Sequence, residues 1–307
     1  MSPEIPKQVK QYSIGYLVGK GSSSSVYQAY DTKKQEFFAA KFISREIFHG
    51  DGEYLRHVES ELRILERIDH PYIAKFVETI FLEKYIVIIT ELCVNGTLSQ
   101  YNLSHEKLPD SKIYTIVQQT ALALNYLHSR GIFHRDIKPE NIGFDENMNV
   151  KLIDFGFSTE SQMLDQSLAC GTPYFIAPEV LYSESYDGAK ADMWSLGTMV
   201  YYLVHKQSIF GDLSPTQYMK KLGRVNVVQI NGYGHMKRIL ESLIQIDPNQ
   251  RSSAAELLKL PIFTGESNIR ARSASLPLMS NSRSTTSTRK LIIRPTMKNT
   301  KSFVCLH

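Results

Sequence analysis

The hydrophobic pattern of the first ninety residues predicts several strands. Apolar side chains alternate with other residues over 14–18, which is the period of a half-buried strand, and a glycine-containing turn follows. The pattern predicts a return strand over 26–30 and a third strand over 37–43. The run 85–92 is almost entirely apolar, as expected for a strand buried on both faces.

Helical spacing appears in four other segments. Apolar residues recur every three or four positions over 55–65, which predicts one amphipathic helix ending near His70. Further helices are predicted over 110–131, with Asp110 and Gly131 as caps, over 193–204 and over 239–244.

The change from strand to helical spacing falls at a short segment near residues 90–96. We therefore expect an α+β protein of two lobes, with a sheet-rich lobe at about 12–90 and a larger helical lobe at about 97–263. Residues 1–11 would form an N-terminal extension.

Composition supports a globular, soluble protein. The chain has 307 residues, 42% hydrophobic and 21% charged, which excludes a collagenous or wholly disordered chain. We find no apolar run of 18 residues and no signal-peptide core, so no membrane-spanning helix is expected. Three cysteines are too few for a disulfide framework and lack zinc-ligand spacing. We expect reduced thiols and a cytoplasmic location, with nuclear access left open.

Charge is concentrated at the C-terminal end. Residues 264–307 hold eight basic residues, one acidic residue and 14 Ser or Thr, while the rest of the chain has a net charge of −3. Such a segment buries too little apolar surface to offset its ordering entropy, so we expect a disordered tail. It is either simply solvated or in weak contact with an anionic surface; no specific nucleic-acid binding is expected.

Three local patterns suggest chemistry, and each has a plain structural alternative. Gly19 and Gly21 allow close approach to a phosphate, or form an ordinary hairpin turn. Lys41 interrupts an apolar strand, so it either pairs with an acid, for which Glu61 is a candidate, or extends its amine to water. Residues 134–141 hold five ionisable groups and suit either a site or a solvated turn.

The order of the motifs makes the combination specific. From about Tyr12 to Phe263 the chain resembles the eukaryotic protein kinase family, serine/threonine branch, nearest the calcium/calmodulin-kinase-like and AMP-kinase-like groups. The matching segments are GKGSSSSV at 19–26, AAK ending at Lys41, SELRIL with Glu61, HRDIKPEN at 134–141, DFG at 154–156, APE at 177–179, DMWSLG with Asp192 and DPNQR with Arg251.

The resemblance implies a bilobal fold, with a small antiparallel-sheet lobe that carries one helix, and a serine/threonine kinase activity on protein substrates. It assigns catalytic roles to Asp136, Lys138, Lys41 and Glu61, and Mg²⁺ binding to Asn141 and Asp154. It implies an ATP-binding set of Val18, Gly19, Gly21, Val26, Ala39, Lys41, Thr90, Glu91 and Cys93. It also implies a structural ion pair between Glu179 and Arg251, and a hydroxyl of Thr172 coupled to the catalytic loop.

The chain departs from the family pattern in two places, the glycine turn and the activation segment. Ser24 stands where a third glycine is usual. In the activation segment, Leu168 occupies the usual phosphorylated position and Thr159 that of a second basic residue. Activity would then be independent of phosphate, unless Ser167 accepts the phosphate instead. All five central polar residues, Lys41, Glu61, Asp136, Asn141 and Asp154, are present, which favours an active kinase. A pseudokinase acting as a binding scaffold is the alternative function.

Overall fold

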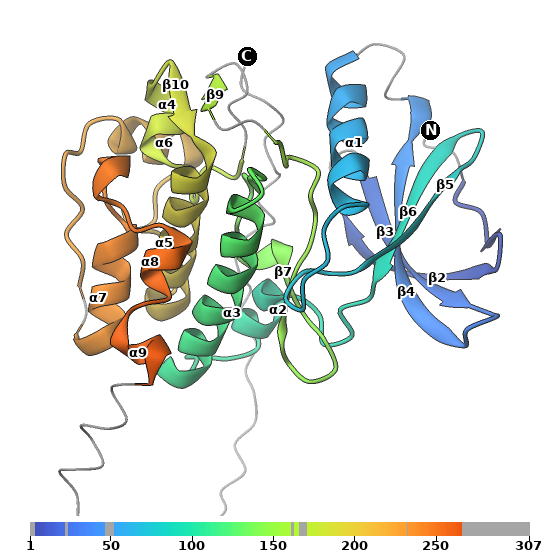
Figure 1. Ribbon diagram of the computed structural model, residues 1–307, viewed down its shortest axis with the longest axis horizontal. Coiled ribbons are helices and arrows are strands. Elements are labelled where there is room, and N and C mark those ends of the chain that lie inside the picture. The colour runs from blue at the N-terminus through green and yellow to red at the C-terminus, as the bar shows by residue number, and fades with distance from the viewer. Residues whose placement is uncertain are drawn as a thin grey trace, which may run out of the picture.

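The structure is a computed structural model that describes residues 4–21, 24–46, 52–160, 163–165, 171–231 and 233–265. It has two lobes side by side, one built on a sheet and one on helices (Figure 1). The predicted α+β, bilobal architecture is therefore confirmed.

The small lobe is a six-stranded antiparallel sheet with one helix, α1 (Gly52–Leu65). The strand order is β1-β2-β3-β4-β6-β5. The strands are β1 (Gln8–Val9), β2 (Tyr12–Lys20), β3 (Ser24–Asp31), β4 (Glu36–Ser44), β5 (Phe76–Phe81) and β6 (Tyr85–Glu91). The pattern predicted four of them but not the short β1 or the half-buried β5.

Two boundaries in the small lobe differ from expectation. Val9 is buried, so β1 adds residues before Tyr12 to the sheet and its core. Helix α1 ends at Leu65 rather than near His70, because the chain tightens there into a turn in which the Arg67 amide donates to the Ile64 carbonyl.

The large lobe surrounds the long, almost completely buried helix α5 (Gly188–His205). Helices α3 (Asp110–His128) and α7 (Gly234–Leu243) pack against it. The remaining elements are α2 (Leu98–Leu103), η2 (Pro139–Asn141), β7 (Ile142–Phe144), β8 (Val150–Leu152), β9 (Met163–Asp165), α4 (Pro178–Tyr182), β10 (Ser185–Asp187), α6 (Pro215–Leu222), η4 (Pro248–Gln250), α8 (Ala254–Leu257) and α9 (Pro261–Thr264).

The predicted caps of α3 were each misplaced. Pro109 is the N-cap and Asp110 the first helical residue, because extended Pro109 fixes the start without a side-chain hydrogen bond. At the other end Ser129 is the C-cap, and Gly131 follows in a left-handed conformation with φ of 69°. That turn lets the Ile132 amide donate to the Leu127 carbonyl.

The lobes join between the end of β6 and the start of α2, where the sequence pattern predicted a hinge. The Asn95 amide donates to the Phe144 carbonyl and the Phe144 amide to the Gly96 carbonyl. These bonds fix the segment that connects the lobes against the paired strands β7 and β8. Among the residues that the structure describes, no helix has the length and apolar character needed to cross a membrane. The predicted tail beyond residue 265 lies outside them.

Candidate active site

The register of the small-lobe sheet brings much of the predicted nucleotide-binding set onto one face. Gly19 pairs with Val26, and Val26 pairs with Lys41. Ala39, two positions before Lys41, pairs with Thr90. Directly paired residues and residues two apart on a strand share a face. The side of the sheet that carries Lys41 therefore also carries Val26, Ala39 and Thr90.

The glycine turn at the end of β2 leaves room for a ligand. A Cβ added at Gly19 would meet no atom of the described residues within 4 Å, so packing does not require a glycine there. Val18 is the extra residue of a β-bulge and is 41% exposed. The Gly21 amide donates to the Ser24 carbonyl at 2.8 Å. Ser24 itself lies in β3, paired with Ile43, so its backbone needs no glycine.

The hinge presents backbone groups from Glu91 and Cys93. The Glu91 amide already donates to the Lys75 carbonyl at 2.8 Å, so this amide is not available to a ligand. The Cys93 carbonyl accepts from the Gly96 amide at 3.0 Å, whereas the structure gives its amide no such bond among the described residues. Burial, with a smaller effect of the Glu91 charge, raises the pKa of the Cys93 thiol to about 12. The thiol is therefore a packing group and not a nucleophile.

Two residues that support this hinge were missed from the sequence. Lys151 forms an ion pair with Glu91 at 2.8 Å. Gly143 lies against Cys93 so closely that a Cβ at Gly143 would be 2.2 Å from Sγ. A lysine between two buried residues of β8 was a usable signal for Lys151; nothing local marks Gly143.

A three-residue ion network connects the two lobes. Lys41 Nζ lies 2.6 Å from Glu61 Oε1 and 2.8 Å from Asp154 Oδ1. Burial would lower the pKa of Lys41, but the two carboxylates outweigh it and raise that pKa. Asp154 is 47% exposed, and although partial desolvation opposes its ionisation, Lys41 and then Lys138 hold its pKa at about 2. Burial raises the pKa of Glu61, and Lys41 counteracts the shift.

Each partner of this network comes from a different element. Glu61 is buried on α1 and Lys41 lies on β4, while Asp154 follows β8 with a left-handed φ of 61°. A Cβ at Gly156 would lie 3.3 Å from Asp154 Oδ1 and 3.5 Å from Lys41 Nζ, so the glycine allows this close approach.

Asp136 is the centre of a second polar cluster. Its Oδ1 accepts from Thr172 Oγ1 at 3.0 Å, and its Oδ2 lies 2.6 Å from Lys138 Nζ. Lys138 Nζ also donates to Thr172 Oγ1 at 2.9 Å, and Asn141 Nδ2 donates to Asp136 Oδ2 at 2.9 Å. The predicted coupling of Thr172 to the catalytic loop is therefore present. The contacts orient both carboxylate oxygens.

The predicted metal ligands flank two paired strands, since Asn141 comes directly before β7 and Asp154 follows β8. Ile142 pairs with Leu152, and the Ile153 amide donates to the Asn141 carbonyl at 3.0 Å, so Asn141 lies beside Asp154. Asn141 uses its amide nitrogen on Asp136, which leaves its side-chain oxygen as the ligand atom. The described residues hold no cluster of three or more His, Cys, Asp or Glu that would bind a metal alone. A carboxylate and an amide oxygen suit Mg²⁺, which usually takes its other ligands from phosphates and water.

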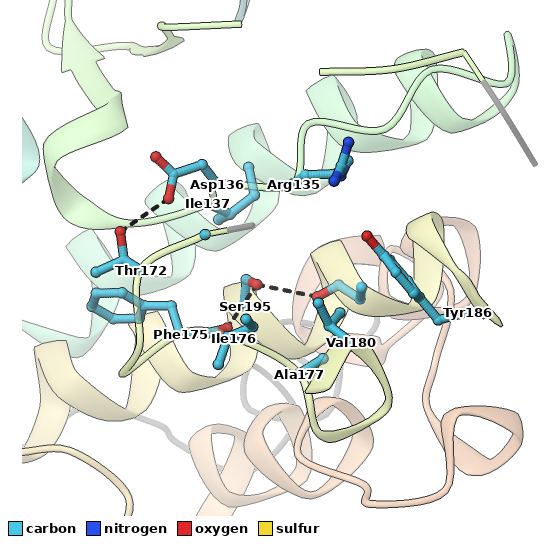
Figure 2. Close-up of a pocket in the computed structure, with 12 residues that line it drawn as sticks. Arg135, Asp136, Ile137, Thr172, Phe175, Ile176, Ala177, Val180, Tyr186 and Ser195 are labelled. Atoms are coloured by element: carbon cyan, nitrogen blue, oxygen red, sulfur yellow. Dashed lines mark hydrogen bonds between the residues drawn. The ribbon is translucent and has the colours of Figure 1, made fainter. Parts of the chain in front are cut away.

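A pocket opens beside Asp136, with a volume of about 320 Å³ that includes its solvent-open part. Figure 2 shows Asp136 and Thr172 joined by their hydrogen bond, with Ile176, Ala177 and Val180 along another wall. The predicted acid–base residue is therefore adjacent to a mainly apolar recess.

Comparison with known proteins agrees with this geometry. The family described as Protein kinase domain matches residues 12–263. CBL-interacting serine/threonine-protein kinase 21 of Arabidopsis thaliana is 32% identical over 254 residues, which cover 82% of this chain and 61% of that protein. CBL-interacting protein kinase 2 of Oryza sativa subsp. japonica is 31% identical over 260 residues, covering 83% and 58%.

This chain thus spans about three fifths of the length of these relatives. The family match covers both lobes and every residue of the two polar clusters. The sheet register, the ion network that connects the lobes and this match lead to one conclusion: the chain belongs to the protein kinase domain family.

Proposed function

We propose that this protein is an active serine/threonine protein kinase that transfers the γ-phosphate of ATP to Ser and Thr hydroxyls of protein substrates. The observation that carries this is the joined set of five polar residues. Lys41, Glu61 and Asp154 form one network. Asn141, which lies beside Asp154, donates a hydrogen bond to Asp136 and so connects the two polar clusters. Phosphoryl transfer depends mainly on positioning and charge stabilisation, which such a set provides.

Each residue of this set would act on a different part of the reactants. Lys41, held by Glu61, would bind the inner phosphates, and the glycine turn would lie over them. Asn141 and Asp154 would hold Mg²⁺, which when bound neutralises charge on the phosphates. Asp136 would orient the acceptor hydroxyl and take up its proton, while Lys138 would face the transferred phosphoryl group.

Transfer of radiolabelled γ-phosphate to a generic basic protein tests this proposal. We expect label on Ser and Thr that requires Mg²⁺ and is lost in Asp154→Asn. A wild-type protein that binds nucleotide but transfers no phosphate would favour the scaffold alternative. Preferential labelling of Tyr in acid hydrolysates would contradict the proposed acceptor class.

We also propose weak selectivity for Arg before the acceptor residue. The family positions that carry acids in Arg-selective kinases correspond here to Thr97, which caps α2, and Tyr202. Burial, and then the charge of Glu140, raise the pKa of the Tyr202 phenol. Glu140, which accepts from Ser99 Oγ at 3.0 Å, is thus the acid available for a mild basic preference.

A pair of peptides with Arg or Ala upstream of the acceptor measures this selectivity. Neutral Thr97 and Tyr202 cannot form charge-assisted hydrogen bonds to guanidinium, so we expect a modest loss for Ala. A loss in kcat/KM above about a hundredfold, ~2.7 kcal/mol, would contradict the proposal.

A further inference from the structure

A carboxylate just after the DFG segment binds two arginines of the α1 region. Glu160 Oε2 accepts from Arg63 Nε at 3.1 Å, and Glu160 Oε1 accepts from Arg67 Nη1 at 2.5 Å. Arg63 is in the last turn of α1, and Arg67 lies in the turn that follows it. Each carboxylate oxygen therefore has its own guanidinium partner.

The backbone next to Glu160 is fixed to the catalytic loop. The Phe133 amide donates to the Thr159 carbonyl at 2.9 Å, and the Thr159 amide donates to the Phe133 carbonyl at 3.1 Å. Phe133 immediately precedes the His134–Asn141 loop. One residue earlier, Ser60 Oγ of α1 donates to the Ser158 carbonyl at 3.3 Å. Residues 158–160 therefore connect α1 to the loop that carries Asp136.

The position of α1 decides whether Glu61 reaches Lys41. Ser60 and Arg63 are spaced at i and i+3 on α1, so they lie along one side of the helix, next to Glu61. Arg67 follows in the turn after the helix. In protein kinases, phosphorylation of the activation loop and the position of this helix control the Lys–Glu pair. A phosphate acts there by adding negative charge near arginines. Here Glu160 already provides a negative charge at two arginines.

We propose that Glu160, Arg63 and Arg67 form an ionic clasp that positions α1, and with it Glu61, for phosphoryl transfer without a phosphate on the activation segment. Glu160 is a positioning residue in this proposal, which rests on the proposed kinase function. The arginine side chains are each 60% exposed and Glu160 is 25% exposed, so water and salt reach the clasp. Its contribution is therefore a modest population shift that weakens with ionic strength.

The test begins with Glu160→Gln in the full-length chain. We expect kcat/KM to fall about three- to tenfold at low ionic strength, about 0.65–1.4 kcal/mol. The double variant Arg63→Gln/Arg67→Gln should show the same loss, and the triple variant no further loss. The charge-swapped variant Glu160→Arg/Arg63→Glu/Arg67→Glu should recover most of the activity.

Matched controls are available on the same helix. Arg56 and Glu59 are exposed and form no ion pair among the described residues, so Arg56→Gln and Glu59→Gln should keep full activity. Raising KCl should lower wild-type activity toward that of Glu160→Gln while leaving the variant little changed. A purely structural role would lower Tm and show neither the rescue nor this loss of salt dependence.

A readout without turnover separates this proposal from the proposed function. Affinity for a fluorescent ADP analogue with Mg²⁺ should fall in Glu160→Gln and recover in the charge swap, even if the wild type transfers no phosphate. Unchanged affinity and activity in Glu160→Gln, or failure of the charge swap to restore either one, would overturn the clasp.

Discussion

The imidazole of His134 shows how a single buried side chain sets a pH dependence. The ring is fully buried, and Nε2 lies 3.1 Å from the Ile153 carbonyl. The Asp136 amide donates to Nδ1 at 3.3 Å. The neutral ring with its proton on Nε2 satisfies both contacts, since it donates from one nitrogen and accepts at the other.

Burial lowers the pKa of His134 from its ordinary value of 6.5, and it outweighs the opposite effects of Asp192, Asp136 and Asp154. The unfolded chain therefore takes up the proton first as the pH falls. The contribution of His134 to stability is complete above pH 6.5 and is lost below it, with a slope of at most about 1.4 kcal/mol per pH unit.

Chemical denaturation between pH 8 and pH 5 measures this effect by comparing the wild type with His134→Phe. The wild type should lose more stability than the variant over this range, because the variant has no proton to bind at this position. Equal losses in the two proteins would show that His134 does not titrate as its burial implies.

The ion pair between Glu179 and Arg251 fastens elements of the large lobe to one another. Arg251 donates from Nη1 to Glu179 Oε1 at 2.5 Å and from Nη2 to Oε2 at 3.0 Å. Its guanidinium lies 5.1 Å from the ring centroid of Trp194 on α5. Glu179 is on α4 and Arg251 directly follows η4, so the predicted structural pair connects α4, α5 and η4.

Arg251→Met should lower the free energy of unfolding by about 3–5 kcal/mol, because it leaves the buried Glu179 carboxylate without its cation. The double variant Arg251→Met/Glu179→Leu should recover much of that loss. As a control, Lys237→Met removes the exposed pair with Glu241 and should cost under about 1 kcal/mol. A double variant as unstable as Arg251→Met alone would contradict this interpretation.

Features set by residues close together in the sequence could be predicted, whereas contacts between segments far apart in the sequence could not. Alternation predicted β2, a return strand after the glycine turn predicted β3, and apolar runs predicted β4 and β6. The apolar setting of Lys41 made Glu61 a candidate partner. The contact between Gly143 and Cys93 could not be predicted, because it depends on how β7 packs beneath the hinge. The Glu160 clasp was missed for the same reason: α1 and the DFG segment are about a hundred residues apart in sequence.

Activation concerns the whole molecule because it requires both lobes to be held together. Thr159 pairs with Phe133, which directly precedes the catalytic loop. By the resemblance to the family, Thr159 stands where many relatives have a second basic residue for a phosphate. Ser167 and Leu168 lie outside the described residues. Because Leu168 cannot accept phosphate, phosphatase-treated protein and Ser167→Ala should keep activity within about tenfold of the untreated wild type, or ~1.4 kcal/mol.

Steady-state kinetics of both samples, with mass spectrometry to confirm removal of phosphate, check this independence. A larger loss in Ser167→Ala that is restored by Ser167→Glu would identify Ser167 as a regulatory phosphorylation site.

The central claim is that Asp136 acts on the acceptor hydroxyl within an intact catalytic set. The direct measurement is kcat of Asp136→Asn at saturating ATP and peptide, alongside its Tm and its affinity for ADP. We predict a fall in kcat of about 10²–10⁴-fold, since the amide cannot take up the proton, with the fold and nucleotide binding retained. Turnover close to that of the wild type in Asp136→Asn would contradict the account.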